Sequence, residues 1–96
     1  MVTLASVLAR SSEVRYRKVG EDAVIVHQTT AEITGLNEVA AHLFDLLDGE
    51  RTVAEILESV LDQYDVGRGR LQRDALELFN RLEVAGLLSE CTGAPR

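Results

Sequence analysis

Apolar residues recur at three- and four-residue spacing between positions 36 and 64, a pattern that predicts two consecutive amphipathic helices. Asn37 is a good N-cap for the first helix, and Gly49 supplies the left-handed residue that can end it. Thr52 and Glu55 form a capping-box pair for the second helix. Helices joined by about four residues are expected to pack their stripes together. The stripe comprises Leu36, Val39, Ala40, Leu43, Phe44, Leu47, Val53, Ile56, Leu57, Val60, Leu61 and Tyr64.

Two segments before these helices have alternating side-chain character or are rich in β-branched residues. They predict strands over about 13–19 and 23–28. The turn chemistry of 20–22 indicates that these two strands form a hairpin. A third strand is expected over about 32–36, although its composition is weak for a strand. One reason to assign it is that a hairpin by itself is marginally stable.

A third helix is predicted from about Arg70 to Ala85, after a loop over 65–69 that contains two glycines. Leu71, Ala75, Leu78 and Leu82 form its central stripe, and Leu76 and Phe79 widen that stripe on one side. Gly86 is placed to end the helix, with Leu87 and Leu88 folding back onto the core.

Three strands followed by three helices predict an α+β fold, in which helices pack on an N-terminal antiparallel sheet. We expect the packed domain to span residues 13–89. Residues 1–12 are expected to be a flexible or loosely packed arm, with a short helical turn on the core as the alternative. Residues 90–96, which include Gly93 and Pro95, are expected to form a flexible tail.

The composition is that of one ordinary globular domain, with 96 residues, 46% of them hydrophobic and 27% charged. The net charge of −6 argues against a general affinity for nucleic acid, because phosphate contacts need Lys and Arg. Cys91 is the one cysteine, and a free thiol in a reducing cytoplasm is its simplest interpretation. The sequence shows no signal peptide and no apolar run approaching the ~18 residues of a membrane helix.

The sequence gives no support to an enzyme, a cofactor site or a metal site. His27 and His42 fall on different predicted elements, and His42 is expected to be a half-exposed structural residue. No serine has the context of a nucleophile, and metal-ligand spacing is absent. We therefore expect no catalytic residues and no bound metal or cofactor.

A DNA-binding regulator is an alternative, because three helices with a small sheet resemble helix-turn-helix proteins. Arg68, Arg70, Arg73 and Arg81 could contact phosphates. Acidic residues are interspersed on the same helix, however, and the sheet precedes all three helices instead of following the third. A structural dimerisation module is a further alternative.

Peptide binding by strand addition fits the pattern best. If the third strand is a sheet edge, its free N–H and C=O groups can accept another strand, and Gly35 would let that backbone come close. At 100° per residue, one flank of the third helix carries Gln72, Leu76, Phe79 and Glu83, which could line a groove beside that edge. The alternative, that Leu76 and Phe79 simply belong to the core, stays open.

The segment LNEVAAHLFDLLDGERTVAEI, a later Asp74-Ala75 pair in the third helix and the terminal LEVAGLL resemble the PqqD-like family, also called RiPP recognition elements. The resemblance covers roughly residues 14–89, and it implies the third strand as well. It implies a winged-helix-like bundle of three helices with the sheet on its N-terminal side. It also implies a non-catalytic chaperone that binds the leader of a ribosomally made precursor peptide. The chaperone would present that peptide to a radical-SAM enzyme, a cyclase or a peptidase.

In this family the leader adds as a strand along the third strand, beside the third helix. Carried over by position, this implies peptide-binding residues Glu32, Ile33, Thr34, Gly35, Leu36, Gln72, Arg73, Leu76, Phe79 and Asn80. Arg73 is a plausible partner for acidic leader residues. The pathway that makes the quinone cofactor PQQ is only one candidate, and we expect a cytoplasmic monomer or weak homodimer that binds neither nucleic acid nor membrane.

Overall fold

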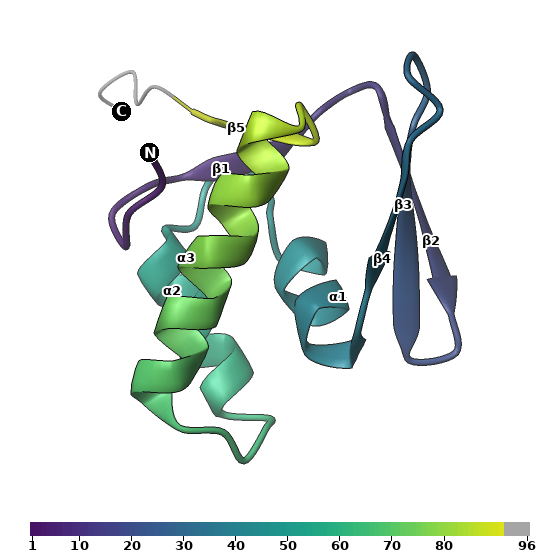
Figure 1. Cartoon of the computed structure of the whole chain (residues 1–96). Coiled ribbons are helices and arrows are strands. Elements are labelled where there is room, and N and C mark those ends of the chain that lie inside the picture. The colour runs from purple at the N-terminus through teal and green to yellow at the C-terminus, as the bar shows by residue number, and fades with distance from the viewer. Residues whose placement is uncertain (92–96) are drawn as a thin grey trace.

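The computed structural model describes residues 1–91. Three strands and three helices follow the predicted order, with an unpredicted short strand before them and another after them. The elements are β1 (Leu8–Arg10), β2 (Val14–Val19), β3 (Asp22–His27), β4 (Ile33–Leu36), α1 (Glu38–Asp45), α2 (Val53–Leu61), α3 (Arg68–Val84) and β5 (Leu88–Glu90). Figure 1 shows α1 between the three-stranded sheet on one side and α2 and α3 on the other. The predicted α+β fold is confirmed.

The three-stranded sheet is antiparallel with the order β2-β3-β4, and tight turns connect its strands. Gly20, at a φ of +64°, begins the two-residue turn between β2 and β3, and this left-handed conformation favours glycine. Along one row of the sheet Tyr16, Ile25 and Thr34 lie opposite one another. Ile25 is fully buried, so this face of the sheet packs on the core, as the alternating pattern predicts.

The N-caps of α1 and α2 are those expected from the sequence. The side chain of Asn37 accepts a hydrogen bond of 2.9 Å from the amide of Ala40, and Thr52 and Glu55 make both bonds of a capping box. Three boundaries differ from expectation. α1 ends at Asp45 with Leu46 as its C-cap, so Gly49 does not end it. α2 ends at Leu61, and α3 begins at Arg68 with Gly67 as its N-cap. Gly69 therefore lies inside the helix and not in the preceding loop.

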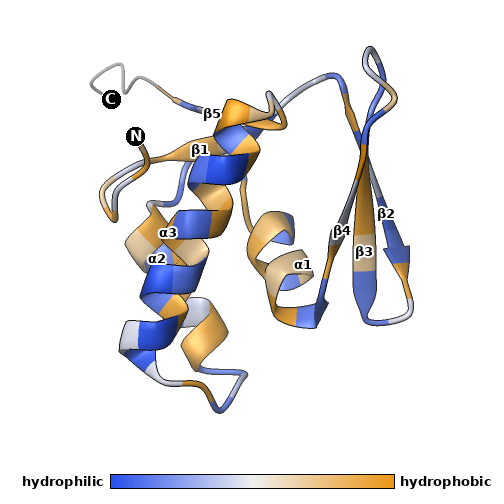
Figure 2. Cartoon of the chain, in the orientation of Figure 1, coloured by the Kyte–Doolittle hydropathy of each residue, from blue (hydrophilic) through white to orange (hydrophobic). Residues whose placement is uncertain are grey.

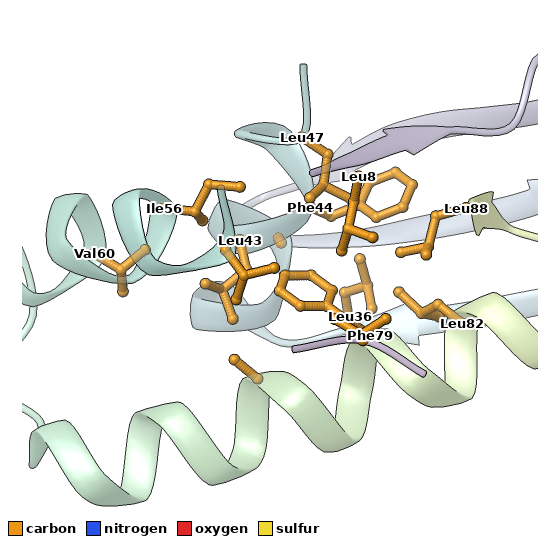
Figure 3. Close-up of a cluster of buried hydrophobic side chains, with 14 of the residues drawn as sticks. Leu8, Leu36, Leu43, Phe44, Leu47, Ile56, Val60, Phe79, Leu82 and Leu88 are labelled. Atoms are coloured by element: carbon orange, nitrogen blue, oxygen red, sulfur yellow. The ribbon is translucent and has the colours of Figure 1, made fainter. Parts of the chain in front are cut away.

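The core is built around two phenylalanines, Phe44 from α1 and Phe79 from α3, and both are fully buried (Figure 3). Leucine, isoleucine and valine side chains from both sheets and from all three helices surround the two rings. Figure 2 shows α1, at the centre of the fold, as mostly apolar, whereas α3 alternates between polar and apolar residues along its length. Of the predicted stripe of α1, Leu43 and Phe44 are thus in the core, whereas Val39 and Ala40 pack against it partly exposed.

The N-terminal segment is packed and not loose, which corrects our expectation for residues 1–12. β1 pairs antiparallel with β5, and the side chain of Leu8 is fully buried. Val2 is also buried, and the amide of Cys91 donates a 2.7 Å hydrogen bond to the carbonyl oxygen of Val7. The packed body therefore begins near the first residues. Of the expected tail, Glu90 lies in β5 and residues 92–96 lie outside the described residues.

Candidate functional site: an open strand edge beside an apolar groove

β4 is an edge strand of the three-stranded sheet, and only β3 pairs with it among residues 1–91. The amide of His27 donates a 3.0 Å hydrogen bond to the carbonyl oxygen of Glu32, which fixes the phase of the ladder. In an antiparallel pair, hydrogen-bonded and non-bonded positions alternate. Thr34 and Leu36 therefore bond to β3, whereas the N–H and C=O groups of Ile33 and Gly35 point away from the sheet.

The turn that leads into β4 is held by His27, which gives this histidine a structural role. Its ring Nδ1 accepts hydrogen bonds from the amides of Thr29, at 3.2 Å, and Thr30, at 3.3 Å. The amide of Ala31 donates a 2.7 Å hydrogen bond to the backbone carbonyl oxygen of His27. These bonds position the start of the open edge.

A groove of about 580 Å³ lies between α1 and α3, beside the C-terminal end of β4. Apolar side chains form its floor and walls, and charged side chains of α3 form its rim. The lining residues are Asn37, Val39, Ala40, Leu43, Asp65, Val66, Gly67, Arg70, Leu71, Asp74, Ala75, Glu77, Leu78 and Arg81. Asn37, which directly follows Leu36 at the end of β4, is the lining residue nearest to the strand in sequence.

The rim carries charges of both signs. Arg70 Nε lies 3.7 Å from Asp74 Oδ2, so these two side chains largely neutralise each other at the surface. Arg81 lies one turn from Leu78 and makes no ion pair with any residue from 1 to 91. Among the charged residues of the rim, Arg81 is therefore the one whose positive charge could pair with an acidic group in the groove.

The strand half of the expected peptide site has the geometry that strand addition needs. Ile33, Thr34, Gly35 and Leu36 form β4, and Glu32 precedes it. Ile33 is 70% exposed, while Leu36 is buried against the core. The side chains therefore alternate between an open outer face and the face that packs on α1.

The helix half of the expected site lies on the flank of α3 that faces α2 and the N-terminal segment. Phe79 is fully buried and therefore belongs to the core. Arg73 is exposed and does not line the groove. Gln72 lines a small recess between α2, α3 and Leu4. These placements, together with those of Leu76 and Asn80, correct the expectation that this flank faces β4.

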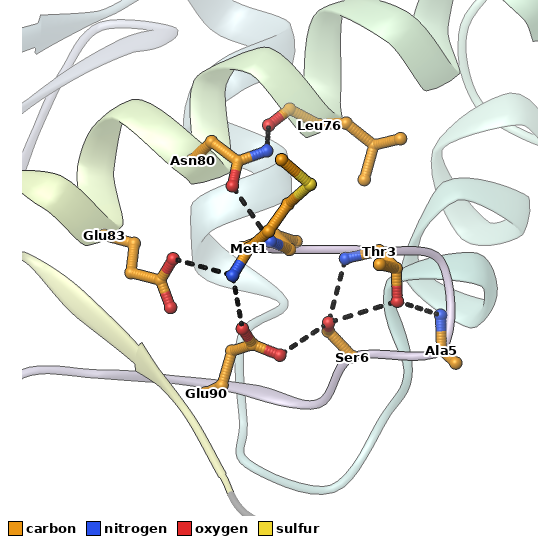
Figure 4. Close-up of polar contacts among 9 residues, drawn as sticks. Met1, Thr3, Ala5, Ser6, Leu76, Asn80, Glu83 and Glu90 are labelled. Atoms are coloured by element: carbon orange, nitrogen blue, oxygen red, sulfur yellow. Dashed lines mark hydrogen bonds and ion pairs between the residues drawn. The ribbon is translucent and has the colours of Figure 1, made fainter.

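The N-terminal segment covers that flank, as Figure 4 shows. Oδ1 of Asn80 accepts a 2.9 Å hydrogen bond from the amide of Val2, and Nδ2 donates to the carbonyl oxygen of Leu76. Ser6 donates a 2.8 Å hydrogen bond to Glu90, which lowers the pKa of that carboxyl group. The opposite flank of α3, which carries Arg70, Asp74 and Arg81, is the one that lines the groove.

Sequence reasoning missed Arg70, Asp74, Glu77 and Arg81 as groove residues. A helical wheel gives both flanks of α3, but it cannot say which one the rest of the chain covers. The apolar residues Val2, Leu4 and Leu8 were the available signal, because they indicate a segment that needs a surface to pack on.

The other candidate residues show structural contacts. His42 packs edge-on against Tyr64, with ring centroids 5.7 Å apart, and Cys91 is half-buried. Within residues 1–91 no three His, Cys, Asp or Glu side chains are grouped closely enough to hold a metal ion. Over the same part of the chain, no helix has both the length and the apolar character needed to cross a bilayer.

A family model described as coenzyme PQQ synthesis protein D (PqqD) matches residues 22–88. This chain belongs to the PqqD family. A curated relative, the PqqA binding protein of Rhodopseudomonas palustris (strain TIE-1), is 26% identical over 88 residues, which cover 92% of this chain and 84% of that protein.

A solved structure described as TbiB1 in complex with the TbiA(β) leader peptide matches with a TM-score of 0.77. The sequences are 24% identical, and the match covers 88% of this chain and 99% of that one, which establishes a common fold. The PqqD match begins at Asp22, so the segment that covers Asn80 lies outside it. The matched segment therefore contains β3, β4 and the three helices.

Proposed function

We propose that this chain binds the leader segment of a ribosomally made precursor peptide by adding it as a strand to β4. The chain would then present the rest of the precursor to a modifying enzyme, such as a radical-SAM enzyme, a cyclase or a peptidase. In this proposal it acts in the cytoplasm as an adaptor without chemistry of its own. Membership of the PqqD family supports this function, as do the PqqA-binding relative and the common fold with the leader-bound TbiB1.

The observation that carries the proposal is the open edge of β4 beside an apolar groove. A peptide strand could bond to the outward-pointing main-chain groups of Ile33 and Gly35, and such bonds tolerate varied sequence. Leader side chains on the inner face would then point toward the groove floor at Val39 and Ala40. Main-chain bonds would supply much of the affinity, and the groove would supply selectivity.

The proposed binding residues therefore keep the strand expected from the sequence and replace the helix flank. The strand contributes Glu32, Ile33, Thr34, Gly35 and Leu36, and α3 contributes Arg70, Asp74, Leu78 and Arg81. Arg81 takes the place of Arg73 as the partner for an acidic leader residue.

DNA binding, the alternative class, has no comparable support. Arg68 is engaged by Glu58 and Arg70 by Asp74, so two of the arginines considered for phosphate contacts already have acidic partners. The remaining arginines of α3, Arg73 and Arg81, lie on a chain of net charge −6.

Nuclear magnetic resonance titration of the full chain tests the proposal. The probes are the PqqA peptide, the TbiA(β) leader and short peptides selected on this chain from a randomised display library. Amide signals of residues 33–36 and 70–81 are expected to shift together with at least one probe. Shifts confined to β2 and β3, or no binding by any probe, would contradict strand addition at β4. Titration with duplex DNA at physiological salt provides the control for the alternative class.

A further inference from the structure

Gly35 is a glycine for which the fold itself gives no reason. It lies within β4, where glycine weakens a strand because it has no side chain to pack. Its φ is not positive, and a Cβ atom built on it would meet nothing within 4 Å. Neither backbone conformation nor crowding inside the chain therefore requires glycine. The remaining reason for glycine within a strand is the close approach of another chain.

Gly35 lies at the edge of a recess on the outer face of the three-stranded sheet. It is directly opposite Val24 of β3, and Val19 at the end of β2 is 57% exposed. These residues line a shallow recess of about 390 Å³ together with Asp22 and Asn37. Its walls are mainly apolar, and the carboxylate of Asp22 makes it unfavourable for an acidic group.

A strand that pairs with β4 would place one side chain over Gly35. Residues directly opposite each other in a sheet point to the same face, and Gly35 points to the outer face with Ile33 and Val24. Because Gly35 has no side chain, the residue opposite it can lie across the strand toward Val24 of β3. A valine or larger residue at position 35 would occupy that space.

We propose that this recess is a second specificity site, which takes one large aliphatic or aromatic side chain of the peptide bound to β4. The site rests on the proposed function, since it exists only for a strand added at this edge. In the bound peptide, the residues before and after the one opposite Gly35 point to the other face of the sheet, toward the groove between α1 and α3. A bound peptide is therefore recognised on both faces of the sheet. One large apolar residue binds on the outer face, and the residues before and after it lie on the inner face.

The test varies the size of the side chain at position 35 of the chain and the size of the peptide residue that lies opposite it. Peptides selected on the full chain from a randomised library are compared with versions whose outward large residue is replaced by glycine. Wild-type chain is expected to prefer the large residue by at least roughly tenfold in Kd. In Gly35→Val this preference should vanish or reverse, because the valine side chain fills the recess. Gly35→Ala should lie between the two.

Two controls separate lost recognition from lost folding. Thermal unfolding of Gly35→Val should be equal to or higher in Tm than wild type, because valine suits a strand better than glycine. Gly69→Ala is the matched glycine variant: position 69 is also open to a Cβ and lies in α3, outside the recess. It should leave both the affinity and the size preference unchanged.

The outcomes distinguish the two proposals. If Ile33→Pro binds the selected peptides as well as wild type, strand addition at β4 fails, and the recess fails with it. If Ile33→Pro loses binding but Gly35→Val keeps the same preference for the large residue, only the recess is wrong. The chain is also tested without peptide. If it dimerises and Gly35→Val abolishes the dimer, the recess is occupied by a second copy of the chain and not by the peptide.

Discussion

The amide of Val2 donates a 2.9 Å hydrogen bond to Oδ1 of Asn80, and this bond joins the first residues of the chain to the third helix. Nδ2 of Asn80 donates in turn to the carbonyl oxygen of Leu76, so one side chain connects the N-terminal segment to α3. That flank of the helix is therefore occupied from within the chain. A peptide that binds between β4 and α3 must use the opposite flank.

Replacing Asn80 should affect folding and not peptide binding. Asn80→Ala leaves the part-buried amide of Val2 without its partner, and a buried donor left unpaired costs about 1–3 kcal/mol. Urea unfolding should report this loss, while the peptide Kd of the folded variant stays at the wild-type value. A large loss of affinity with unchanged stability would place the peptide on the Asn80 flank.

Charge reversal on α3 should distinguish its two flanks. Arg81→Glu is expected to weaken an acidic peptide, because Arg81 lines the groove, and the wild-type affinity should fall with added salt. Arg73→Glu is the matched control, since Arg73 is exposed on the same helix and does not line the groove. Fluorescence anisotropy at several salt concentrations measures both. Equal weakening by the two variants would indicate a long-range charge effect and no contact at Arg81.

Proline at neighbouring positions of β4 should have opposite consequences. The amide of Ile33 points to the open edge, so Ile33→Pro should fold and yet lose peptide binding. The amide of Thr34 points into the ladder with β3, so Thr34→Pro should lower the free energy of unfolding. Circular dichroism melting and peptide titration check the pair. A stable Thr34→Pro together with an unfolded Ile33→Pro would mean that the phase of the ladder is reversed.

Truncation of the central ring should destabilise the whole fold. Phe44 is fully buried and its ring centroid lies 5.3 Å from that of Tyr16, so Phe44→Ala should cost about 3–5 kcal/mol. Val84→Ala is the control: Val84 is 88% exposed, and its loss should change the free energy of unfolding by less than about 0.5 kcal/mol. An unchanged Tm for Phe44→Ala would show that this stripe is not the core.

Acid should loosen the contact between the N-terminal segment and β5. The hydrogen bond from Ser6, aided by the amino group of Met1, holds the pKa of Glu90 below its ordinary value. A carboxyl group with a lowered folded-state pKa stabilises the fold above its unfolded pKa. That contribution is lost as the pH falls through the folded value. Stability measured from neutral pH to about pH 3 should therefore fall more in wild type than in Glu90→Gln. Parallel curves would mean that this carboxylate does not contribute.

The local elements were predictable because their signals lie within a few residues of one another. Asn37 and the Thr52–Glu55 pair cap their helices as the sequence predicts, and Phe44 is buried as its stripe position requires. β4 was assigned despite its weak composition, and its position is confirmed. The pairing of β1 with β5 was not predicted. It joins three-residue strands about eighty positions apart, and nothing in either strand specifies its partner.

The sequence by itself determined the order of β2, β3, β4 and the three helices, the N-caps of α1 and α2, and most of the core positions, because helix and strand periods are properties of short segments. The family resemblance added the expectation that the strand with Gly35 binds a peptide beside the third helix, which stays a prediction. Only the tertiary structure decided which flank of that helix faces the groove. The two flanks of an apolar stripe are equivalent on a helical wheel until another segment covers one of them. Here the covering segment holds Val2, which is 78 positions from Asn80 and is brought to it by the pairing of β1 with β5.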